Sequence, residues 1–519
     1  MIEQNLLDAV KQYTANLDKD ITFVLQTGEH SKREELKSFL NDIVSVSERL
    51  HLEENDFTDA RSPISFTLLA DKTHTGIIFS GIPGGHEFSS LILAILQAGG
   101  TALKLDESVQ ALVRNVKEPL RFETFISLSC HNCPEVVQAL NQFALLNPLI
   151  SNDMIDGGLF QEEIEKRNIQ GVPAVFLNDE SFANGKIDTA KLIEKLLEKY
   201  PHITEGAAST QALPLQDVTV IGGGPAGAAA AIYAARKGLK VTLIADRIGG
   251  QVKDTMGIEN LIGTKETTGP KLAAQLQEHI RANDITVKEN LSVKSVEKGE
   301  KSHAVILQTG ERIDTRTLII ASGAKWRELG VPGEKENLGQ GVAYCPHCDG
   351  PFFKGKHVAV IGGGNSGIEA AIDLAGIVRH VSVFEFADSL KADKVLVDAA
   401  QKRDNIDIYL GVATQSIQAS GGKVTALEYQ KRADQSTHRL ELDGVFVQIG
   451  LVPNTAFLGD TVRLSKFGEI EVNARGETST PGIFAAGDCT TVPYKQIVIA
   501  MGEGAKAALS AFDYLIRQN

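Results

Sequence analysis

The chain contains two stretches in which an apolar strand runs directly into the glycine pattern GxGxxG. The first stretch is Val218–Gly227 and the second is His357–Gly367. Each is followed by a helix and a second apolar strand that ends in a carboxylate, Asp246 in the first case and Glu385 in the second. Glycine is required where the backbone meets a pyrophosphate and where the helix packs on the strand, and the helix N-terminus attracts phosphate. The order of elements predicts two dinucleotide-binding Rossmann-like units.

Other segments carry candidate contacts for the first unit. A Gly-Gly-Gln segment follows its second strand, Thr317–Ala324 is expected to form a strand with a tight turn, and Gly482–Asp488 a strand that ends at a glycine turn. Because the last segment lies beyond the second loop, the first unit is predicted to be interrupted by the second. This arrangement is typical of flavoproteins that bind FAD at the first loop and a nicotinamide dinucleotide at the second. The candidate FAD contacts are Gly222, Gly224, Pro225, Ala226, Gly227, Asp246, Gly250, Gln251, Gly323, Gly487 and Asp488.

The second loop predicts a preference between the two nicotinamide dinucleotides. A carboxylate at Glu385 would bind the ribose 2′-hydroxyl of NADH and repel the 2′-phosphate of NADPH. The next five residues, Phe386–Leu390, offer no arginine to hold such a phosphate, although Lys391 and Lys394 would do so if the strand ended later. We therefore expect NADH. The candidate contacts are Gly362, Gly364, Asn365, Ser366, Gly367 and Glu385.

Four of the five cysteines form two CxxC pairs, Cys130–Cys133 and Cys345–Cys348. The N-terminus lacks a signal-peptide pattern and no apolar run is long enough to span a bilayer, so we expect a cytoplasmic protein without a membrane anchor. In a reducing cytosol, paired cysteines indicate redox chemistry or metal. The fifth, Cys489, has no partner and is expected to be an inert buried thiol. A net charge of −14 argues against a nucleic-acid partner.

The first CxxC lies in a segment with the order of elements of thioredoxin. A strand over Arg121–Leu128 precedes it, a helix over Pro134–Leu146 follows, and Gly171–Phe176 is a strand led by Pro173, which is expected to be the cis proline facing the disulfide. A CxxC at a helix N-terminus has a lowered cysteine pKa. Cys130 should be the more exposed, attacking thiol, and Cys133 the resolving thiol.

A weaker copy of this segment precedes it. A strand over Thr22–Leu25 and a helix over Ser31–Leu40 flank Thr27–His30, which stands where the cysteines would be, and Gly81-Ile82-Pro83 parallels Gly171-Val172-Pro173. We expect a tandem pair of thioredoxin-like folds of which only the second is redox-active. Two interpretations of Glu87 stay open: it influences the Cys130 site, or it is a solvated residue at a helix start.

The predicted fold class is α/β, with the tandem thioredoxin-like folds followed by an FAD-binding Rossmann-like domain into which an NAD-binding Rossmann-like domain is inserted. A chain of 519 residues has room for several domains. The expected boundaries are 1–102 and 103–200 for the thioredoxin-like folds, 201–215 for a flexible linker, 216–328 and 454–519 for the FAD-binding domain, and 329–453 for the NAD-binding domain carrying the second CxxC.

These motifs resemble a known family. Residues 216–519 resemble the low-molecular-weight thioredoxin reductase class, and the full chain resembles the flavin-containing subunits of bacterial alkyl hydroperoxide reductases. The resemblance is carried by Cys345–Asp349, Gly362–Gly367, Ala485–Asp488 and Cys130–Cys133. One departure is Ala321-Ser322-Gly323, where the family usually has Ala-Thr-Gly; serine keeps the hydroxyl.

The resemblance implies one FAD per chain, NADH as donor, a homodimer and a separate peroxiredoxin as electron acceptor. It assigns Cys348 to the flavin, Cys345 to exchange with the Cys130–Cys133 pair, and Cys130 to attack on the peroxiredoxin disulfide. Tyr494-Lys495-Gln496 resembles the family segment near the flavin, which makes Gln496 a further candidate FAD contact and leaves Lys495 between that role and an ordinary surface lysine. Asp349 is a candidate proton donor or a helix-capping carboxylate.

Several alternatives remain. His131 and His347 either tune the thiol pKa values or are exposed residues without a role. A four-cysteine zinc site would need both pairs to converge on one ion, and such pairs usually lie within a few tens of residues of each other, so we expect no metal. A general thioredoxin-like disulfide reductase, and an NADH oxidase that makes hydrogen peroxide, are the rival functions.

Overall fold

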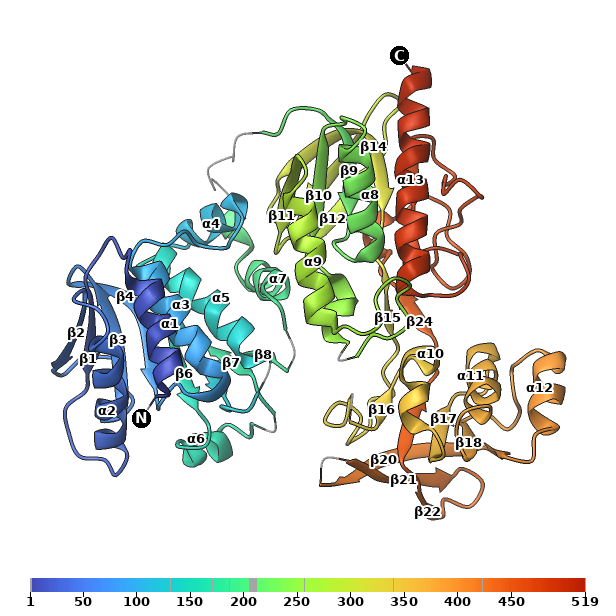
Figure 1. The fold of residues 1–519 in the computed structure, drawn as a ribbon, viewed down its shortest axis with the longest axis horizontal. Helices are drawn as coiled ribbons and strands as arrows, with labels where there is room; N and C mark the ends of the chain where they lie inside the picture. Colours follow the sequence, from blue (N-terminus) through green and yellow to red (C-terminus); the bar gives the residue numbers. More distant parts are fainter. Residues whose placement is uncertain are drawn as a thin grey trace.

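The computed structural model describes residues 2–130, 132–169, 171–185, 187–204, 212–255, 257–338, 340–421 and 423–518, without the side chains of His347 and Cys348. Figure 1 shows a thioredoxin-like unit on one side and two Rossmann-like units on the other. Seven of the fifteen residues of the predicted linker, 205–211, lie outside the described residues, as does His131. In the described part of the chain, no helix is long and apolar enough to cross a membrane.

The thioredoxin-like unit packs helices against a mixed sheet. Its elements are α1 Gln4–Thr14, β1 Ile21–Leu25, α2 Arg33–Val44, β2 Leu50–Glu54, β3 Ser65–Ala70, β4 Thr73–Ser80, η1 Gly85–Glu87, α3 Phe88–Ala98, α4 Glu107–Arg114, β5 Leu120–Ile126, α5 Cys133–Leu146, β6 Ile150–Asp156, α6 Gln161–Lys166, β7 Ala174–Leu177, β8 Glu180–Asn184, α7 Thr189–Lys199 and η2 Pro201–Thr204.

The strand order of this unit shows the tandem repeat. Among the described residues the sheet has eight strands in the order β2-β1-β3-β4-β6-β5-β7-β8. In the first half β1 is parallel to β2 and antiparallel to β3, and in the second half β5 is parallel to β6 and antiparallel to β7. The halves join through the parallel pair β4 and β6. The central strands β1 and β5 are almost wholly buried, as expected for strands covered on both faces.

The topology corrects one detail of the predicted repeat. Val172–Pro173 is a cis peptide and leads into β7, as predicted. The equivalent strand of the first half is β3, and the proline before it is Pro63; Pro83 instead follows β4. The match of Pro83 with Pro173 is therefore wrong. The Gly-Ile-Pro tripeptide has a sequence similar to Gly-Val-Pro, but it follows the β3–β4 pair along the chain, whereas Gly-Val-Pro precedes the β7–β8 pair.

The two Rossmann-like units follow. Their elements are β9 Gln216–Ile221, α8 Pro225–Ala235, β10 Val241–Ala245, η3 Gly250–Asp254, α9 Gly269–Arg281, β11 Ile285–Glu289, β12 Val293–Glu297, β13 His303–Leu307, β14 Arg312–Ile320, β15 Ala324–Trp326, β16 Val342–Ala343, α10 Pro346–Asp349, η4 Gly350–Phe353, β17 His357–Ile361, α11 Asn365–Ala375, β18 His380–Glu385, α12 Lys394–Gln401, β19 Ile406–Leu410, β20 Val412–Ser420, β21 Lys423–Lys431, β22 Thr437–Glu441, β23 Gly444–Val447, β24 Leu451–Pro453, η5 Ala456–Leu458, β25 Ile483–Ala485, η6 Gly487–Cys489 and α13 Ile497–Gln518.

The second Rossmann-like unit is inserted in the first, which confirms the predicted fold class. The first sheet has the order β11-β10-β9-β14-β13-β12, and β25 from the end of the chain pairs with β14. The second sheet, β16-β23-β17-β18-β19, is formed by residues between β14 and β25. The antiparallel pair β15 and β24 connects the two units. The C-terminal helix α13 packs along α8 on the first unit (Figure 1).

The thioredoxin-like unit contacts the first Rossmann-like unit through buried polar groups. The ammonium of Lys288, on β11, lies 3.3 Å from Asp106 and 2.9 Å from Glu311. Lys288 is buried, and the side chains of Asp106 and Glu311 are only 9% and 7% exposed. Beside this pair, the Asn290 amide donates to the carbonyl of Lys104 at 3.3 Å. Because Asp106 caps α4, this ion pair holds the start of that helix against β11.

Candidate active site

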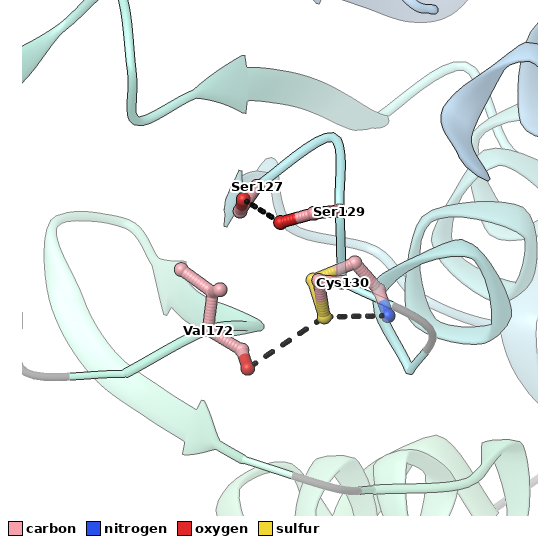
Figure 2. The surroundings of a disulfide bond; sticks show 5 residues. Ser127, Ser129, Cys130 and Val172 are labelled. Atoms are coloured by element: carbon pink, nitrogen blue, oxygen red, sulfur yellow. Dashed lines mark hydrogen bonds between the residues drawn. A yellow bond between two sulfur atoms is a disulfide. The ribbon is translucent and has the colours of Figure 1, made fainter. Parts of the chain in front are cut away.

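The first CxxC pair stands at the start of α5 and forms a disulfide (Figure 2). Cys133 is fully buried, whereas Cys130 is only partly buried, as predicted from its place ahead of the helix. The backbone N–H of Cys133 donates to Sγ of Cys130 at 3.2 Å, and the Val172 carbonyl lies 3.8 Å from the same sulfur. Helix amides beside a sulfur favour its thiolate. The geometry makes Cys130 the accessible sulfur.

The local sequence explains this placement. Pro134 occupies the first turn of α5, where its missing N–H costs no hydrogen bond. Val136, Val137, Leu140 and Phe143 are buried and anchor the helix to the sheet. The carbonyl of Val172, the residue before the cis peptide to Pro173, points toward Cys130 (Figure 2).

Glu87 is buried, so its interpretation as a solvated helix-start residue is wrong. Its side chain is 0% exposed, and neither carboxyl oxygen makes a hydrogen bond within the described residues. Burial raises the pKa of Glu87 to about 7, and nearby Ser90 offsets this slightly. The turn η1 that carries Glu87 packs against α5, and the neighbouring His86 N–H donates to Leu128, just before the CxxC. The titratable carboxyl of Glu87 therefore lies on a turn that packs against α5.

The second CxxC pair stands at the start of the short helix α10, with Cys345 directly before it. Cys345 is disulfide-bonded, whereas the side chains of Cys348 and His347 lie outside the described residues. Asp349, at the end of α10, accepts a hydrogen bond from the backbone of Cys345, and burial raises the pKa of Asp349 to about 6. The carboxyl thus caps the helix and also keeps a proton within reach of neutral pH.

A buried carboxylate that the sequence analysis did not single out supports this second pair. Glu334 is fully buried and accepts from the backbone N–H groups of Leu329 at 2.8 Å and Gly330 at 2.7 Å. Its third donor is the hydroxyl of Tyr344, at 2.8 Å. Burial beside Glu334 raises the pKa of Tyr344, which keeps the hydroxyl protonated. In the sequence, the only hint of this role is that Glu334 lies in a glycine-rich segment. Its three hydrogen-bond donors, Leu329, Gly330 and Tyr344, follow no spacing pattern that would predict the contact.

The first glycine loop forms a cradle that side chains would fill. Gly222 has φ +113°, and a Cβ there would lie 2.1 Å from the Ala321 carbonyl. A Cβ on Gly227 would lie 1.7 Å from the carbonyl of Gly222, whereas a Cβ on Gly224, at the N-cap of α8, would meet the Cα of Gly250 at an ordinary contact distance of 4.0 Å. The loop therefore leaves backbone N–H groups and a helix N-terminus free of side-chain cover, which suits a pyrophosphate.

The structure brings the other candidates for this site to the same edge of the sheet. A Cβ on Gly250 would lie 3.0 Å from Gly224, and a Cβ on Gly487 would lie 2.9 Å from Ala226. The parallel strands β9, β14 and β25 end here, which places Gly323 and Asp488 at this edge. Burial raises the pKa of Asp488.

Three polar side chains complete the surroundings. Asp246 directly follows β10, is exposed, and accepts from Ser292 at 2.8 Å. The Gln251 amide, in the orientation that satisfies both partners, donates to the Ala324 carbonyl at 2.7 Å and accepts from Trp326 at 3.2 Å. Gln496 accepts from Asn260 at 3.1 Å.

Lys495 and Cys489 have structural positions. The Lys495 ammonium donates to the carbonyls of Thr490 at 2.5 Å and Val492 at 2.9 Å and pairs with Glu469 at 3.2 Å, so it is not an ordinary surface lysine. Cys489 is a free, fully buried thiol whose pKa is raised by burial. Its expected inertness agrees with this environment.

The second glycine loop repeats the first cradle. Gly362 has φ +123°, and a Cβ on Gly367 would lie 1.9 Å from the Gly362 carbonyl. Asn365 and Asp393 exchange two hydrogen bonds, at 2.9 and 2.8 Å, which pin the start of α11, and Ser366 is exposed beside them. This loop therefore also fits a pyrophosphate.

Glu385 ends β18 and folds back onto this loop. Its carboxylate accepts from the Gly363 N–H at 2.5 Å and from the Ala387 N–H at 2.7 Å. The strand ends where predicted, so Lys391 and Lys394 lie beyond the turn, and the Lys394 ammonium pairs with Asp398 at 2.8 Å. Within the described residues, no group of three or more His, Cys, Asp or Glu side chains could hold a metal ion.

Each of the two Rossmann-like units carries a glycine loop that fits a pyrophosphate, and the second unit, inserted in the first, also carries a disulfide-bonded cysteine. These features define a two-dinucleotide disulfide oxidoreductase. Residues 216–504 match the family model for pyridine nucleotide-disulphide oxidoreductases, whose members bind FAD and use NAD(P)H, and residues 120–198 match a thioredoxin domain. A thioredoxin reductase structure from Streptococcus pyogenes is 34% identical with a TM-score of 0.56, covering 58% of this chain and 99% of that one.

Comparison over the full length narrows the family. The chain is 51% identical to the F subunit of alkyl hydroperoxide reductase of Pseudomonas aeruginosa, covering 100% of this chain and 99% of the relative. It is also 47% identical to a protein named NADH dehydrogenase from Ferdinandcohnia aciditolerans, covering 100% and 98%. The chain belongs to the family of alkyl hydroperoxide reductase F subunits.

Proposed function

We propose that this chain is an NADH-dependent reductase of a peroxiredoxin disulfide, acting in the cytoplasm as a homodimer. The observation that carries the proposal is the union, in one chain, of an accessible disulfide beside a cis proline and two dinucleotide cradles with a second disulfide-bonded cysteine. The names of full-length relatives support peroxide detoxification as the purpose. In a reducing compartment the disulfides that do occur are usually transient and catalytic, which is the use proposed for these cysteine pairs.

Each step of the reaction is assigned to the part of the chain that carries the corresponding motif. Residues 216–328 with 454–519 would hold FAD, residues 329–453 would hold NADH, and 103–200 would carry the dithiol that meets the partner. When bound, FAD supplies the chemistry that couples oxidation of NADH, a hydride donor, to reduction of a disulfide. Asp246 would bind a ribose hydroxyl of FAD, Glu385 would bind that of NADH, and Asp349 would hold a proton for a leaving thiolate.

The exchange at the partner side is a thiol–disulfide reaction. The Cys130 thiolate attacks one sulfur of the peroxiredoxin disulfide, which forms a mixed disulfide and releases the other sulfur as a thiolate. Cys133 then attacks Sγ of Cys130, restoring their disulfide and releasing the second peroxiredoxin thiolate. The partner gains two electrons and takes up two protons, and the Cys130–Cys133 dithiol loses two electrons. The Cys345–Cys348 dithiol would re-reduce this disulfide by the same chemistry.

An NADH oxidase is the second candidate, because a full-length relative carries the name NADH dehydrogenase. NADH consumption with peroxide present, measured with and without a purified peroxiredoxin, separates the two. We expect consumption and peroxide removal to rise together when the peroxiredoxin is added. Unchanged consumption, with hydrogen peroxide accumulating in air, would support the oxidase instead.

A further inference from the structure

An arginine from a distant hairpin lies against the turn that follows Glu385. Arg432 stands after β21, and its guanidinium lies 4.4 Å from the ring centre of Phe386. It donates to the Phe386 carbonyl at 2.9 Å and pairs with Asp388 at 3.3 Å. The backbone is anchored as well, because the Gly411 N–H donates to Ala387 at 2.9 Å and the Arg432 N–H to Gly411 at 2.8 Å. The contact is therefore built into the fold.

This turn is the place where dinucleotide-binding folds distinguish the two nicotinamide dinucleotides. The acid at the end of the second strand binds the ribose 2′-hydroxyl of NADH, and an arginine nearby accommodates the 2′-phosphate of NADPH. Glu385 is joined to the turn through the Ala387 N–H. The segment Phe386–Leu390 contains no arginine, yet the fold supplies one at the same turn.

The guanidinium is held by an exposed carboxylate. The side chain of Asp388 is 88% exposed and that of Arg432 is 39% exposed. A carboxylate at this position acts twice against a 2′-phosphate, because it repels the phosphate and because it occupies the arginine that would otherwise bind it. Phe386, 62% exposed, offers a flat apolar surface beside the guanidinium.

We propose that Asp388 sets coenzyme choice by holding Arg432, and that Phe386 and Arg432 form the surface against which the adenine end of NADH binds. This inference rests on the proposed use of NADH. With Asp388 neutralised, Arg432 becomes a ligand for a 2′-phosphate. Glu385 then remains as the single carboxylate at the turn that opposes NADPH.

The test measures binding of 2′,5′-ADP and of 5′-ADP to the purified holoenzyme by calorimetry. The variants are D388N, R432M and D388N/R432M. D388N is expected to bind 2′,5′-ADP about threefold to tenfold more tightly than wild type, the size of effect expected for one exposed charge pair. Its affinity for 5′-ADP should change less than twofold. The double variant should lose the gain, and added salt should weaken it.

Two outcomes overturn the inference. Either D388N gains nothing for 2′,5′-ADP, or the double variant keeps the whole gain, in which case charge removal alone or Lys391 accounts for it. Reduction of the wild-type flavin by NADH is recorded in parallel. If NADH fails to reduce the flavin, the proposed function fails; if it succeeds while D388N gains nothing, only the role of Asp388 and Arg432 fails.

Discussion

The hydroxyl of Tyr344, the residue directly before Cys345, donates a hydrogen bond of 2.8 Å to the buried carboxylate of Glu334. The Tyr344 ring also stacks on Trp326 in β15, one of the two strands that join the Rossmann-like units. Cys345 therefore directly follows a residue that packs on the strand pair connecting the two Rossmann-like units. Any movement of one unit relative to the other bears on this contact.

Removing Glu334 should destabilise this region strongly. Glu334→Ala leaves two backbone N–H groups and the Tyr344 hydroxyl without their acceptor, and we expect a loss of about 2–4 kcal/mol in the free energy of unfolding. Tyr344→Phe removes one donor and should cost about 1 kcal/mol. Urea unfolding followed by the fluorescence of Trp326, the single tryptophan, measures both. Tyr233→Phe, at an exposed tyrosine, is the control. A loss in Glu334→Ala no larger than in the control contradicts the assignment.

Glu87 should make stability depend on pH. Its pKa is about 7 in the folded chain and near 4.5 when exposed, so between these values the folded state binds more protons than the unfolded state. The contribution is therefore fully present below about pH 4.5 and is lost as pH rises through 7. The loss amounts to about 3 kcal/mol. Glu87→Gln removes this loss, so the variant should gain on wild type between pH 5.5 and 8.5.

Unfolding midpoints of wild type and Glu87→Gln across that pH range provide the measurement. The exposed residue Glu162, changed to glutamine, is the matched control and should run parallel to wild type. Parallel curves for Glu87→Gln as well would show that the carboxyl does not titrate in this range.

Asp349→Asn separates the two roles of Asp349. Asparagine can still accept the hydrogen bond from Cys345, so the helix cap is kept, but it has no proton to give. In wild type the protonated fraction falls about tenfold for each pH unit above the pKa of about 6. Turnover limited by this proton should fall with it, and the variant should be about 100-fold slower and independent of pH in this range. A variant with the wild-type rate and profile would leave only the capping role.

The Lys288 ion pair should hold the thioredoxin-like unit in the observed contact. Lys288→Met leaves Asp106 and Glu311 buried without their cation, which is costly for buried carboxylates. We expect faster amide hydrogen exchange in α4 and β11, by about tenfold or more. Lys294→Met, at an exposed position on β12, serves as control. Equal exchange in both variants would mean that this ion pair does not hold the contact.

The parts predicted correctly from sequence are those whose signal is local. Strand, glycines, helix and acid follow one another at Gly222–Asp246 and Gly362–Glu385, and a proline leads β7 after the CxxC, so each pattern can be read from neighbouring residues. The sequence similarity of Gly81-Ile82-Pro83 to the cis-proline tripeptide led to a wrong match. For Glu87 the sequence left a solvated helix start and an influence on the Cys130 site both open, because charged residues often start helices.

What sequence could not supply depends on contacts between distant segments. Arg432 reaches the Glu385 turn from a position 46 residues beyond Phe386, and Glu334 gathers donors from Leu329, Gly330 and Tyr344. Neither contact leaves a spacing pattern. Burial of Glu87 follows from the packing of η1 against α5, which only the assembled sheet determines.

The most direct test of the relay is NADH titration of Cys130→Ser, with Cys489→Ala as a cysteine control outside the proposed chemistry. Flavin absorbance reports reduction by NADH, and peroxide removal with a purified peroxiredoxin reports turnover. The account predicts that NADH still reduces the flavin of Cys130→Ser while peroxiredoxin turnover is lost, and that Cys489→Ala behaves as wild type. Full peroxiredoxin turnover in Cys130→Ser would contradict the account.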